Sequence, residues 1–315
     1  MSASTLSPES TLARAADAHR SGDHQGALRL LASLKALRQP IAGVDALRAA
    51  CFVAMGDLAS AEQARREEAR WFPSASANAV ARETLISEAD EGRWIDAALD
   101  AVSRFTMLSE QRLRSLHAMA RSCHDEGIDG EFVECGVAAG GSSALLAGCA
   151  RRLGGRRRVW CFDTFSGMPE PGPEDRARNG VTAEESGWGT GTCSAPERSV
   201  IEAATLFGAA DRLVLRKGLF QETLPLAAKE IGPIALLHLD GDWYDSTRCC
   251  IERLWPHVVP GGFLQVDDYG HWEGCRRAID EFLAPERART GSPIAIERID
   301  YTGVRFRKPM QGGEV

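Results

Sequence analysis

Two groups of acidic residues follow two consecutive predicted strands, and this succession constrains the fold more than any other feature of the chain. The apolar run Ile234–Leu239 ends at the acidic segment 240–242, and the run 262–266, introduced by a Pro-Gly-Gly turn, ends at residues 267–268. Between them, residues 246–258 carry apolar side chains at the spacing of a helix. Strand, helix and strand in this length predict a right-handed βαβ unit whose strands are parallel neighbours.

The acidic groups therefore meet at one edge of the predicted sheet, where open α/β sheets bind their ligands. They contain Asp240, Asp242, Asp267 and Asp268. Carboxylates are hard oxygen ligands of the kind that Mg²⁺ prefers, and a helix cap would need only one residue of the pair at 267–268. The pattern thus favours a metal-dependent site. His238, inside the first strand, is interpreted as a buried, hydrogen-bonded residue rather than a ligand.

Composition and charge narrow the class of protein. The 315 residues are 44% hydrophobic and 26% charged, which is enough for one large domain or two ordinary ones. A net charge of -7 argues against a nucleic-acid surface. No apolar run reaches the roughly 18 residues of a membrane span. Nine cysteines, without a CxxC pair or a signal-peptide pattern, indicate a cytoplasmic protein.

The first 104 residues lack strand signals and predict an all-α region. The segment 21–27, Ser-Gly-Asp-His-Gln-Gly-Ala, recurs 34 residues later at 55–61 as Met-Gly-Asp-Leu-Ala-Ser-Ala. A period of this length resembles tetratricopeptide repeats. So few repeats are expected to pack on the following domain or on a second subunit, as a helical cap in a homo-oligomer, and binding of a partner protein is the alternative. The predicted domains are 1–104, 105–310 and a flexible tail, 311–315.

The second region opens with a strand, a glycine turn and a helix, the arrangement that cradles a phosphate or cofactor. The strand at 131–136 contains Glu134 and ends at Gly136, which is an acid-x-Gly turn and not the GxGxxG turn of dinucleotide sites. Such a turn suits a cofactor with an amino-acid tail. The next strand ends at Asp163, and an acid at that place can accept both hydroxyls of a ribose.

Six ordered motifs then carry a resemblance to a known family. They lie at 131–142, 162–171 (Phe-Asp-Thr-Phe-Ser-Gly-Met-Pro-Glu-Pro), 239–244 (Leu-Asp-Gly-Asp-Trp-Tyr), 260–263, 266–270 (Val-Asp-Asp-Tyr-Gly) and 299–303. Together they resemble the macrocin O-methyltransferases, which use S-adenosylmethionine to methylate sugar hydroxyls of macrolides and aminocoumarins. The likeness covers residues 105–308. It implies a Rossmann-like class I methyltransferase sheet, mostly parallel with an antiparallel edge, and a glycosylated small-molecule acceptor.

The resemblance also assigns roles to individual residues. It implies that Asp240, Asp267 and Asp268 bind Mg²⁺ and that Asp242 is the general base. The S-adenosylmethionine site is expected at Glu134, Gly136, Gly140, Gly141, Ser142, Ser143, Asp163 and Gly218, and Tyr244, His271 and Trp188 are candidates to face the substrate. One departure from the family is Ala138-Ala139, where other members commonly have bulky and basic residues.

A long segment rich in glycine, proline and charge, residues 165–197, is expected to close over the acceptor as a lid. Sugar and phenolic hydroxyls both remain open as acceptors, and so do carbon and nitrogen. A metal-dependent glycosyltransferase that uses the Asp-x-Asp segment 240–242 is the second hypothesis, although it leaves the acid-x-Gly turn without a role. A non-enzymatic adaptor is the third, and the intact acidic set argues against it.

Overall fold

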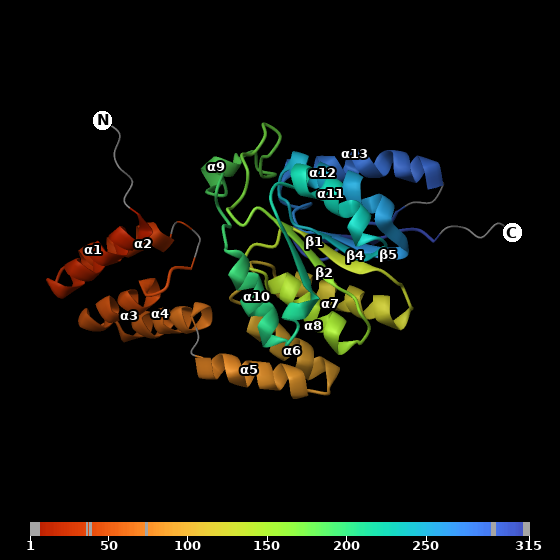
Figure 1. Ribbon diagram of the computed structural model, residues 1–315. Coiled ribbons are helices and arrows are strands. Elements are labelled where there is room, and N and C mark those ends of the chain that lie inside the picture. The colour runs from red at the N-terminus through yellow and green to blue at the C-terminus, as the bar shows by residue number, and fades with distance from the viewer. Residues whose placement is uncertain (1–6, 36, 38–39, 73–74, 291–293, 311–315) are drawn as a thin grey trace. The chain divides into compact units, whose positions relative to one another are not determined.

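The computed structural model describes residues 7–35, 37, 40–72, 75–290 and 294–310, so the predicted tail at 311–315 lies outside the described residues. The chain divides into two compact units, Met1–Val80 and Ala81–Val315 (Figure 1).

The first unit consists of two helical pairs, which confirms that this region is helical. Its helices are α1 (Pro8–Arg20), α2 (His24–Lys35), α3 (Val44–Ala54) and α4 (Leu58–Trp71). The two copies of the sequence repeat fall on the two inter-helix turns, where Gly22 and Gly56 adopt φ values of +87° and +78°. Small and aliphatic residues such as Ala27 and Leu31 fill the core between the helices. The tetratricopeptide assignment itself stays a prediction.

The boundary between the units differs from the one predicted at residue 104. Helix α5 (Ala75–Ser87) spans the division, and α6 (Glu91–Val102) belongs entirely to the second unit. Helix α6 is strongly amphipathic and buries Trp94, Ala98 and Val102 in the same core as α8 (Gly141–Arg152). The sequence shows that α6 has an apolar face but not which partner covers it.

The second unit contains a seven-stranded sheet in the order β3-β2-β1-β4-β5-β7-β6. The strands are β1 (Glu131–Cys135), β2 (Val159–Asp163), β3 (Leu213–Lys217), β4 (Ile234–Leu239), β5 (Val258–Val266), β6 (Glu297–Arg298) and β7 (Val304–Arg307). The first five strands are parallel, and β7 and β6 form an antiparallel edge. This confirms the predicted fold class and the predicted adjacency of β4 and β5.

Helices cover both faces of the sheet (Figure 1). Helices α7 (Glu110–Asp125), α8 and α10 (Glu197–Leu206) pack on one face, and α11 (Phe220–Ile231), α12 (Tyr244–Leu254) and α13 (Glu273–Thr290) pack on the other. Side chains alternate between these cores along β1, so that Phe132 faces the first and Val133 the second. Three short elements, α9 (Ala183–Ser186), η1 (Ala210–Arg212) and η2 (Trp255–His257), complete the unit.

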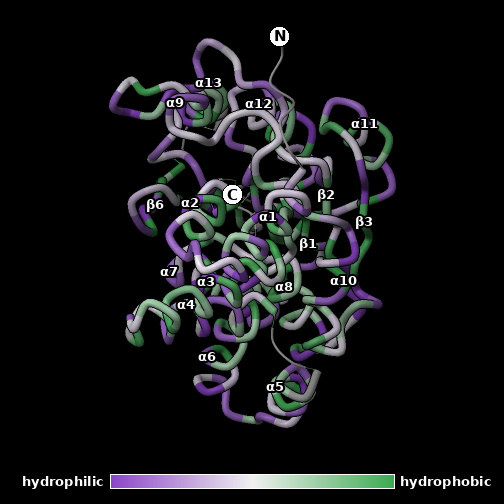
Figure 2. Tube along the Cα trace, turned by 90° about the vertical axis from the view of Figure 1, so that its left-hand side faces the viewer, coloured by the Kyte–Doolittle hydropathy of each residue, from purple (hydrophilic) through white to green (hydrophobic). Residues whose placement is uncertain are grey.

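Hydropathy follows these contacts. Helix α11 changes between hydrophobic and hydrophilic residues along its turns (Figure 2), and it buries Leu224, Ala227 and Ile231. The helix predicted at 246–258 begins at Tyr244 and ends at Leu254, because Pro256 stops it, and Val258 already starts β5.

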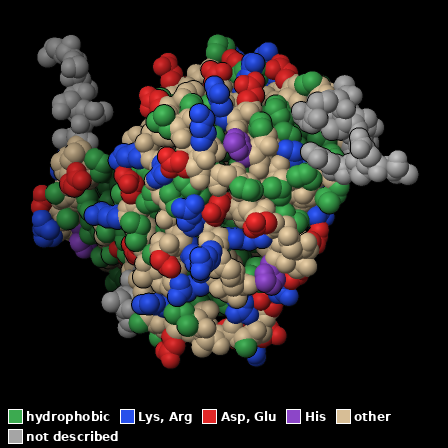
Figure 3. All heavy atoms as spheres, turned by 45° about the vertical axis from the view of Figure 1, so that its right-hand side comes forward, with side chains coloured by type: hydrophobic (Ala, Val, Ile, Leu, Met, Phe, Trp, Pro, Cys, Tyr) green, Lys and Arg blue, Asp and Glu red, His purple; other side chains and the backbone are tan. Residues whose placement is uncertain are grey.

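Charge is mixed on the visible surface. On the face shown in Figure 3, lysine and arginine side chains are interspersed with aspartate and glutamate. Within the described residues, none of the helices is both long enough and apolar enough to cross a membrane.

The absence of a side chain at Gly136 allows the chain after β1 to pass close to the chain after β4. Substitution of Gly136 tests the importance of this close approach. Gly136 has φ +87°, and a Cβ there would lie 1.6 Å from the carbonyl oxygen of Asp240. We expect Gly136→Ala to lower the free energy of unfolding by about 2–5 kcal/mol, from left-handed strain and overpacking together. Urea denaturation measures the change.

Gly127→Ala is the matched control, because Gly127 also has a positive φ, +66°, but a Cβ there would have no neighbouring atom within 4 Å. It should lose only about 1–2 kcal/mol, the cost of the left-handed backbone. Equal losses in the two variants would contradict the role of the close contact.

Candidate active site

A cavity of about 400 Å³ opens at the carboxyl edge of the sheet. Its walls come from the loops after β1, β2, β4 and β5, from the chain before α7, and from the segment 165–197. The loops follow parallel neighbouring strands, so side chains distant in sequence meet around one space. Phe105, Met107 and Phe220 give part of the wall an apolar character.

Four carboxylates gather on the floor of this cavity, as the sequence predicts. Oxygen atoms of Asp240, Asp242 and Asp268 lie within 4.8 Å of one another, and Asp240 is also grouped in this way with His238 and Asp267. Burial, and then repulsion from the neighbouring carboxylates, raises the pKa of Asp240 and of Asp268 well above the ordinary value. Concentrated negative charge of this kind favours a bound cation.

Asp242 is held in a defined position beside this cluster. Its backbone adopts φ +55°, a left-handed conformation that is uncommon outside glycine. The indole Nε1 of Trp272 donates a hydrogen bond of 3.0 Å to Asp242 Oδ1. The backbone N–H of Asp242 donates to Asp268 Oδ2 at 3.2 Å. Burial in the cavity wall raises the pKa of Asp242 to about 7. A carboxylate with such a pKa suits proton transfer near neutral pH.

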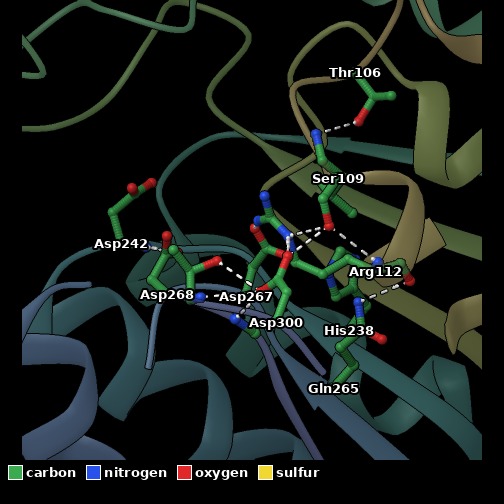
Figure 4. A network of polar contacts seen from close by, with 12 residues as sticks. Thr106, Ser109, Arg112, His238, Asp242, Gln265, Asp267, Asp268 and Asp300 are labelled. Atoms are coloured by element: carbon green, nitrogen blue, oxygen red, sulfur yellow. Dashed lines mark hydrogen bonds and ion pairs between the residues drawn. The ribbon is translucent and has the colours of Figure 1, made fainter. Parts of the chain in front are cut away.

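Arg112 on α7 partly balances the acidic floor (Figure 4). Its guanidinium donates to Asp267 Oδ2 and, at 3.0 Å, to Asp300 Oδ2. Asp300 in turn accepts backbone N–H groups of Thr302 and Gly303 at 3.0 and 2.7 Å. The motif at 299–303 therefore fixes the arginine that holds one oxygen of Asp267.

His238 connects two carboxylates through the interior of the sheet. It is fully buried, its Nδ1 lies 2.7 Å from Glu134 Oε1, and its Nε2 lies 3.6 Å from Asp267 Oδ1, too far for a hydrogen bond. Burial alone would lower its pKa, but the two carboxylates outweigh burial and raise the pKa to about 9. The two carboxylates thus favour the protonated form of His238, and the prediction of a buried, hydrogen-bonded histidine is confirmed by its contact with Glu134.

The predicted cofactor residues fall into two groups. Gly136, Ser142 and Asp163 line the cavity, and Asp163 Oδ2 accepts the N–H groups of Val137 and Ala138 at 2.7 and 2.9 Å. The others do not line it: Glu134, Gly140, Gly141, Ser143 and Gly218.

These remaining residues lie outside the cavity and pack against or bond to the elements that form its wall. Glu134 is fully buried and accepts hydrogen bonds from Ser143 and His238. A Cβ at Gly140 would lie 2.6 Å from Val200, and one at Gly141 would lie 2.7 Å from Thr106, so both glycines permit close packing. Gly218 donates its N–H to the carbonyl of Asp163 at 3.0 Å.

Two of the three candidate substrate-facing residues lie on the cavity, and one does not. Trp188 and His271 line it. Tyr244 is buried outside it, because its hydroxyl donates to Glu281 on α13 at 2.7 Å. The structure does not support the expectation for Tyr244: its side chain points to α13, and Ser246 is the residue in the first turn of α12 that lines the cavity.

The segment 165–197 forms part of the cavity wall through Met168, Pro169, Trp188 and Cys193. It is anchored by buried Asp175, which accepts the backbone N–H of Tyr244 at 2.8 Å and that of Gly172 at 2.7 Å. The segment thus lies where a lid over the cavity is predicted. Its closure over a bound acceptor stays a prediction.

Sequence reasoning missed Arg112, Trp272, Asp175 and Cys193. Arg112 lies in a helix with two other arginines, and Trp272 lies four residues after the acidic pair, in an isolated bridge to Ala177. Position relative to Asp268 was the one signal that pointed to Trp272.

Comparisons with known proteins give a consistent result. A family model described as Macrocin-O-methyltransferase (TylF) matches residues 53–308, beginning earlier than the predicted residue 105. A relative from Streptomyces olivaceus, an 8-demethyl-8-(2,3-dimethoxy-alpha-L-rhamnosyl)-tetracenomycin-C 4'-O-methyltransferase, is 36% identical over 206 residues, 64% of this chain and 75% of the relative. Mycinamicin III 3''-O-methyltransferase from Micromonospora griseorubida is 30% identical over 208 residues, 64% of this chain and 78% of the relative.

Among solved structures, the O-methyltransferase NovP is similar with a TM-score of 0.57 and 26% identity, covering 74% of this chain and 99% of that one. A calicheamicin methyltransferase, CalS11, has a TM-score of 0.53 at 22% identity, with coverage of 76% and 92%, and this likeness shows the fold alone.

The charge on His238 predicts how stability depends on pH. Its folded pKa, about 9, lies above the ordinary 6.5, so its stabilisation is complete below pH 6.5 and is lost as the pH rises through 9. In chelator-treated protein we expect His238→Gln to cost about 3 kcal/mol at pH 6, since it leaves the buried Glu134 carboxylate without its cationic partner. Denaturant unfolding at several pH values should show the gap to wild type shrinking towards pH 10. A gap that stays constant with pH would contradict an imidazolium.

Proposed function

The chain belongs to the macrocin O-methyltransferase family and is an S-adenosylmethionine-dependent O-methyltransferase, and on this premise we propose that it methylates a sugar hydroxyl of a glycosylated natural product with the help of Mg²⁺. The observation that carries the proposal is the position of the Asp242 carboxylate, held by Trp272 beside three further aspartates on the cavity floor.

The acceptor class is supported by the relatives. The two described above are named for methylation at a 4'- and a 3''-oxygen, and the first name specifies a rhamnosyl group. Family membership removes glycosyl transfer and methylation of carbon or nitrogen as alternatives. A phenolic hydroxyl remains the competing acceptor within O-methylation.

The residues around the cavity fit both groups that the reaction needs. Asp163, Gly136 and Ser142 offer a carboxylate, a close backbone approach and a hydroxyl along one wall, where they would hold S-adenosylmethionine, the source of the electrophilic methyl group. On the floor, Asp267 Oδ1 is buried and accepts no hydrogen bond, because His238 Nε2 is 3.6 Å away, while Oδ2 accepts from Arg112. A buried carboxylate oxygen without a hydrogen bond is costly, and a cation bound directly to it would offset that cost.

Asp240, Asp267 and Asp268 would therefore hold Mg²⁺. When bound, the ion lowers the pKa of a coordinated hydroxyl and fixes the direction of its oxygen. A sugar with two neighbouring oxygens matches such a site best.

The chain's own groups then perform the proton transfer and exclude water. Asp242 accepts the hydroxyl proton at its carboxylate while Trp272 fixes the carboxylate's direction. Trp188 and Met168 of the covering segment and Phe220 of α11 surround the space with apolar surface. Water that would compete for the methyl group is thereby kept out.

Asp242→Asn tests the general base. The amide keeps the size of the side chain and can still meet Trp272 through its oxygen, but it cannot accept a proton. We expect kcat to fall about 10²–10⁴-fold, with the affinities for Mg²⁺ and S-adenosylmethionine changed less than about threefold. Steady-state kinetics and calorimetry measure the two effects.

Asp245→Asn is the matched control, since Asp245 is an exposed aspartate only three residues further on, in the first turn of α12. It should keep near-normal turnover. Near-normal turnover in Asp242→Asn as well would remove Asp242 from the mechanism.

The pKa of Asp242 predicts the pH profile. The base must be deprotonated, so kcat/KM should rise with pH up to a pKa near 7 when Mg²⁺ is limiting. A neighbouring cation favours the carboxylate, so saturating Mg²⁺ should move this acidic limb to lower pH. Initial rates at two Mg²⁺ concentrations across pH 5–9 test this, and a limb that does not respond to Mg²⁺ would count against an ion next to Asp242.

A further inference from the structure

A second cluster of metal-ligating side chains lies in the first unit, far in sequence from the carboxylates. Among the described residues, three groups bring histidine, cysteine or carboxylate ligand atoms within 4.8 Å of one another. Two of these groups belong to the cavity floor. The third consists of His19 at the end of α1, His24 at the start of α2 and Cys51 in α3.

The three ligand atoms converge on one point. His19 Nδ1 lies 3.0 Å from His24 Nδ1 and 3.4 Å from Cys51 Sγ. Tetrahedral Zn²⁺, with its usual bond lengths, would separate two nitrogens by roughly 3.3 Å and a nitrogen from a sulfur by roughly 3.6 Å. The two distances from His19 are within a few tenths of an ångström of these values, and all three ligand atoms lie within 4.8 Å of one another.

The turn between α1 and α2 holds the histidines in this arrangement. Gly22 adopts φ +87°, and the backbone N–H groups of Ser21 and Asp23 bond back to Asp17 and Ala18 at 3.0 and 2.9 Å. Cys51 is fully buried in the helical core, whereas both histidines are partly exposed. An ion could therefore reach the cluster from the side of the histidines.

The second copy of the repeat shows that the helical turn itself does not need these histidines. Thirty-four residues after His19 and His24 the chain has Val53 and Leu58, in the same places relative to Gly56 as the histidines have relative to Gly22. Both copies form a helical pair. The histidines are thus an addition to the first copy and not a requirement of the turn.

We propose that His19, His24 and Cys51 form a binding site for a transition-metal ion of the Zn²⁺ class, with a fourth position left for water. Imidazole and thiolate are borderline and soft ligands, which select this class and not Mg²⁺. The ion ties Cys51 of α3 to the hairpin of α1 and α2, so it fastens the two helical pairs to each other. The carboxylate site and this site consequently separate two metals by ligand chemistry.

Titration with Co²⁺ distinguishes a metal site from three side chains that are joined only by hydrogen bonds. The full-length protein is reduced, treated with chelator and titrated with Co²⁺ in excess Mg²⁺. Wild type should show a saturable thiolate-to-cobalt charge-transfer band at one equivalent, and Zn²⁺ should abolish it by displacement. The band reports a thiolate ligand, so cobalt bound to carboxylates alone does not produce it.

Variants assign the band to its ligands. Cys51→Ala should abolish it, and His24→Leu, which introduces the residue of the second copy, should weaken Co²⁺ binding at least tenfold. Cys193→Ala is the matched control, because Cys193 lines the catalytic cavity and is the thiol that could report an ion there. It should leave the band unchanged.

Thermal unfolding shows whether a variant loses metal binding because it is misfolded. Without metal, His24→Leu should melt close to wild type, and Zn²⁺ should raise the Tm of wild type but not that of His24→Leu. The absence of a charge-transfer band in wild type, or a band that survives Cys51→Ala and disappears in Cys193→Ala, would overturn the proposal.

Discussion

The charge balance beneath the cavity is the interaction on which the site depends. Four aspartates meet at the edge of one sheet, and Glu134 lies behind them in β1. Two cations from different elements offset part of this charge: Arg112 from α7 contacts Asp267 and Asp300, and the imidazolium of His238 lies between Glu134 and Asp267. Unpaired, these groups would make the folded state costly. Because both cations contact Asp267, this residue links Glu134 in β1 with the acidic cluster on the cavity floor.

The parallel sheet explains why so much of this could be predicted. Acidic residues that end apolar runs must meet at one edge once the strands are parallel neighbours, and the βαβ pattern around residues 240 and 267 makes them so. Glycine turns and ordered motifs then locate the cofactor wall. Fold class, strand order around β4 and β5, and the positions of Asp240, Asp267 and Asp268 all follow from local patterns.

The features that could not be predicted depend on contacts between elements that are far apart in the sequence. Nothing in the sequence distinguishes Arg112 from the other arginines of its helix. Only the packing of α7 places its guanidinium against Asp267. Tyr244 follows the acidic segment directly, but the rotation of α12 directs its hydroxyl to Glu281. The division between the compact units falls before the predicted residue 104 for the same reason, since α6 has an apolar face that packs with α8, about fifty residues further on.

The left-handed backbone at Asp242 has a consequence for how enzymes of this kind can diversify. Asparagine, aspartate and glycine enter this region of φ most easily, whereas longer or branched side chains meet a steric cost of about 1–2 kcal/mol. A glutamate at position 242 is therefore disfavoured by the backbone, which limits the side chain of a carboxylate there to one methylene group. The shape of the cavity can then vary through its walls, such as the segment 165–197, while the carboxylate at position 242 keeps its place.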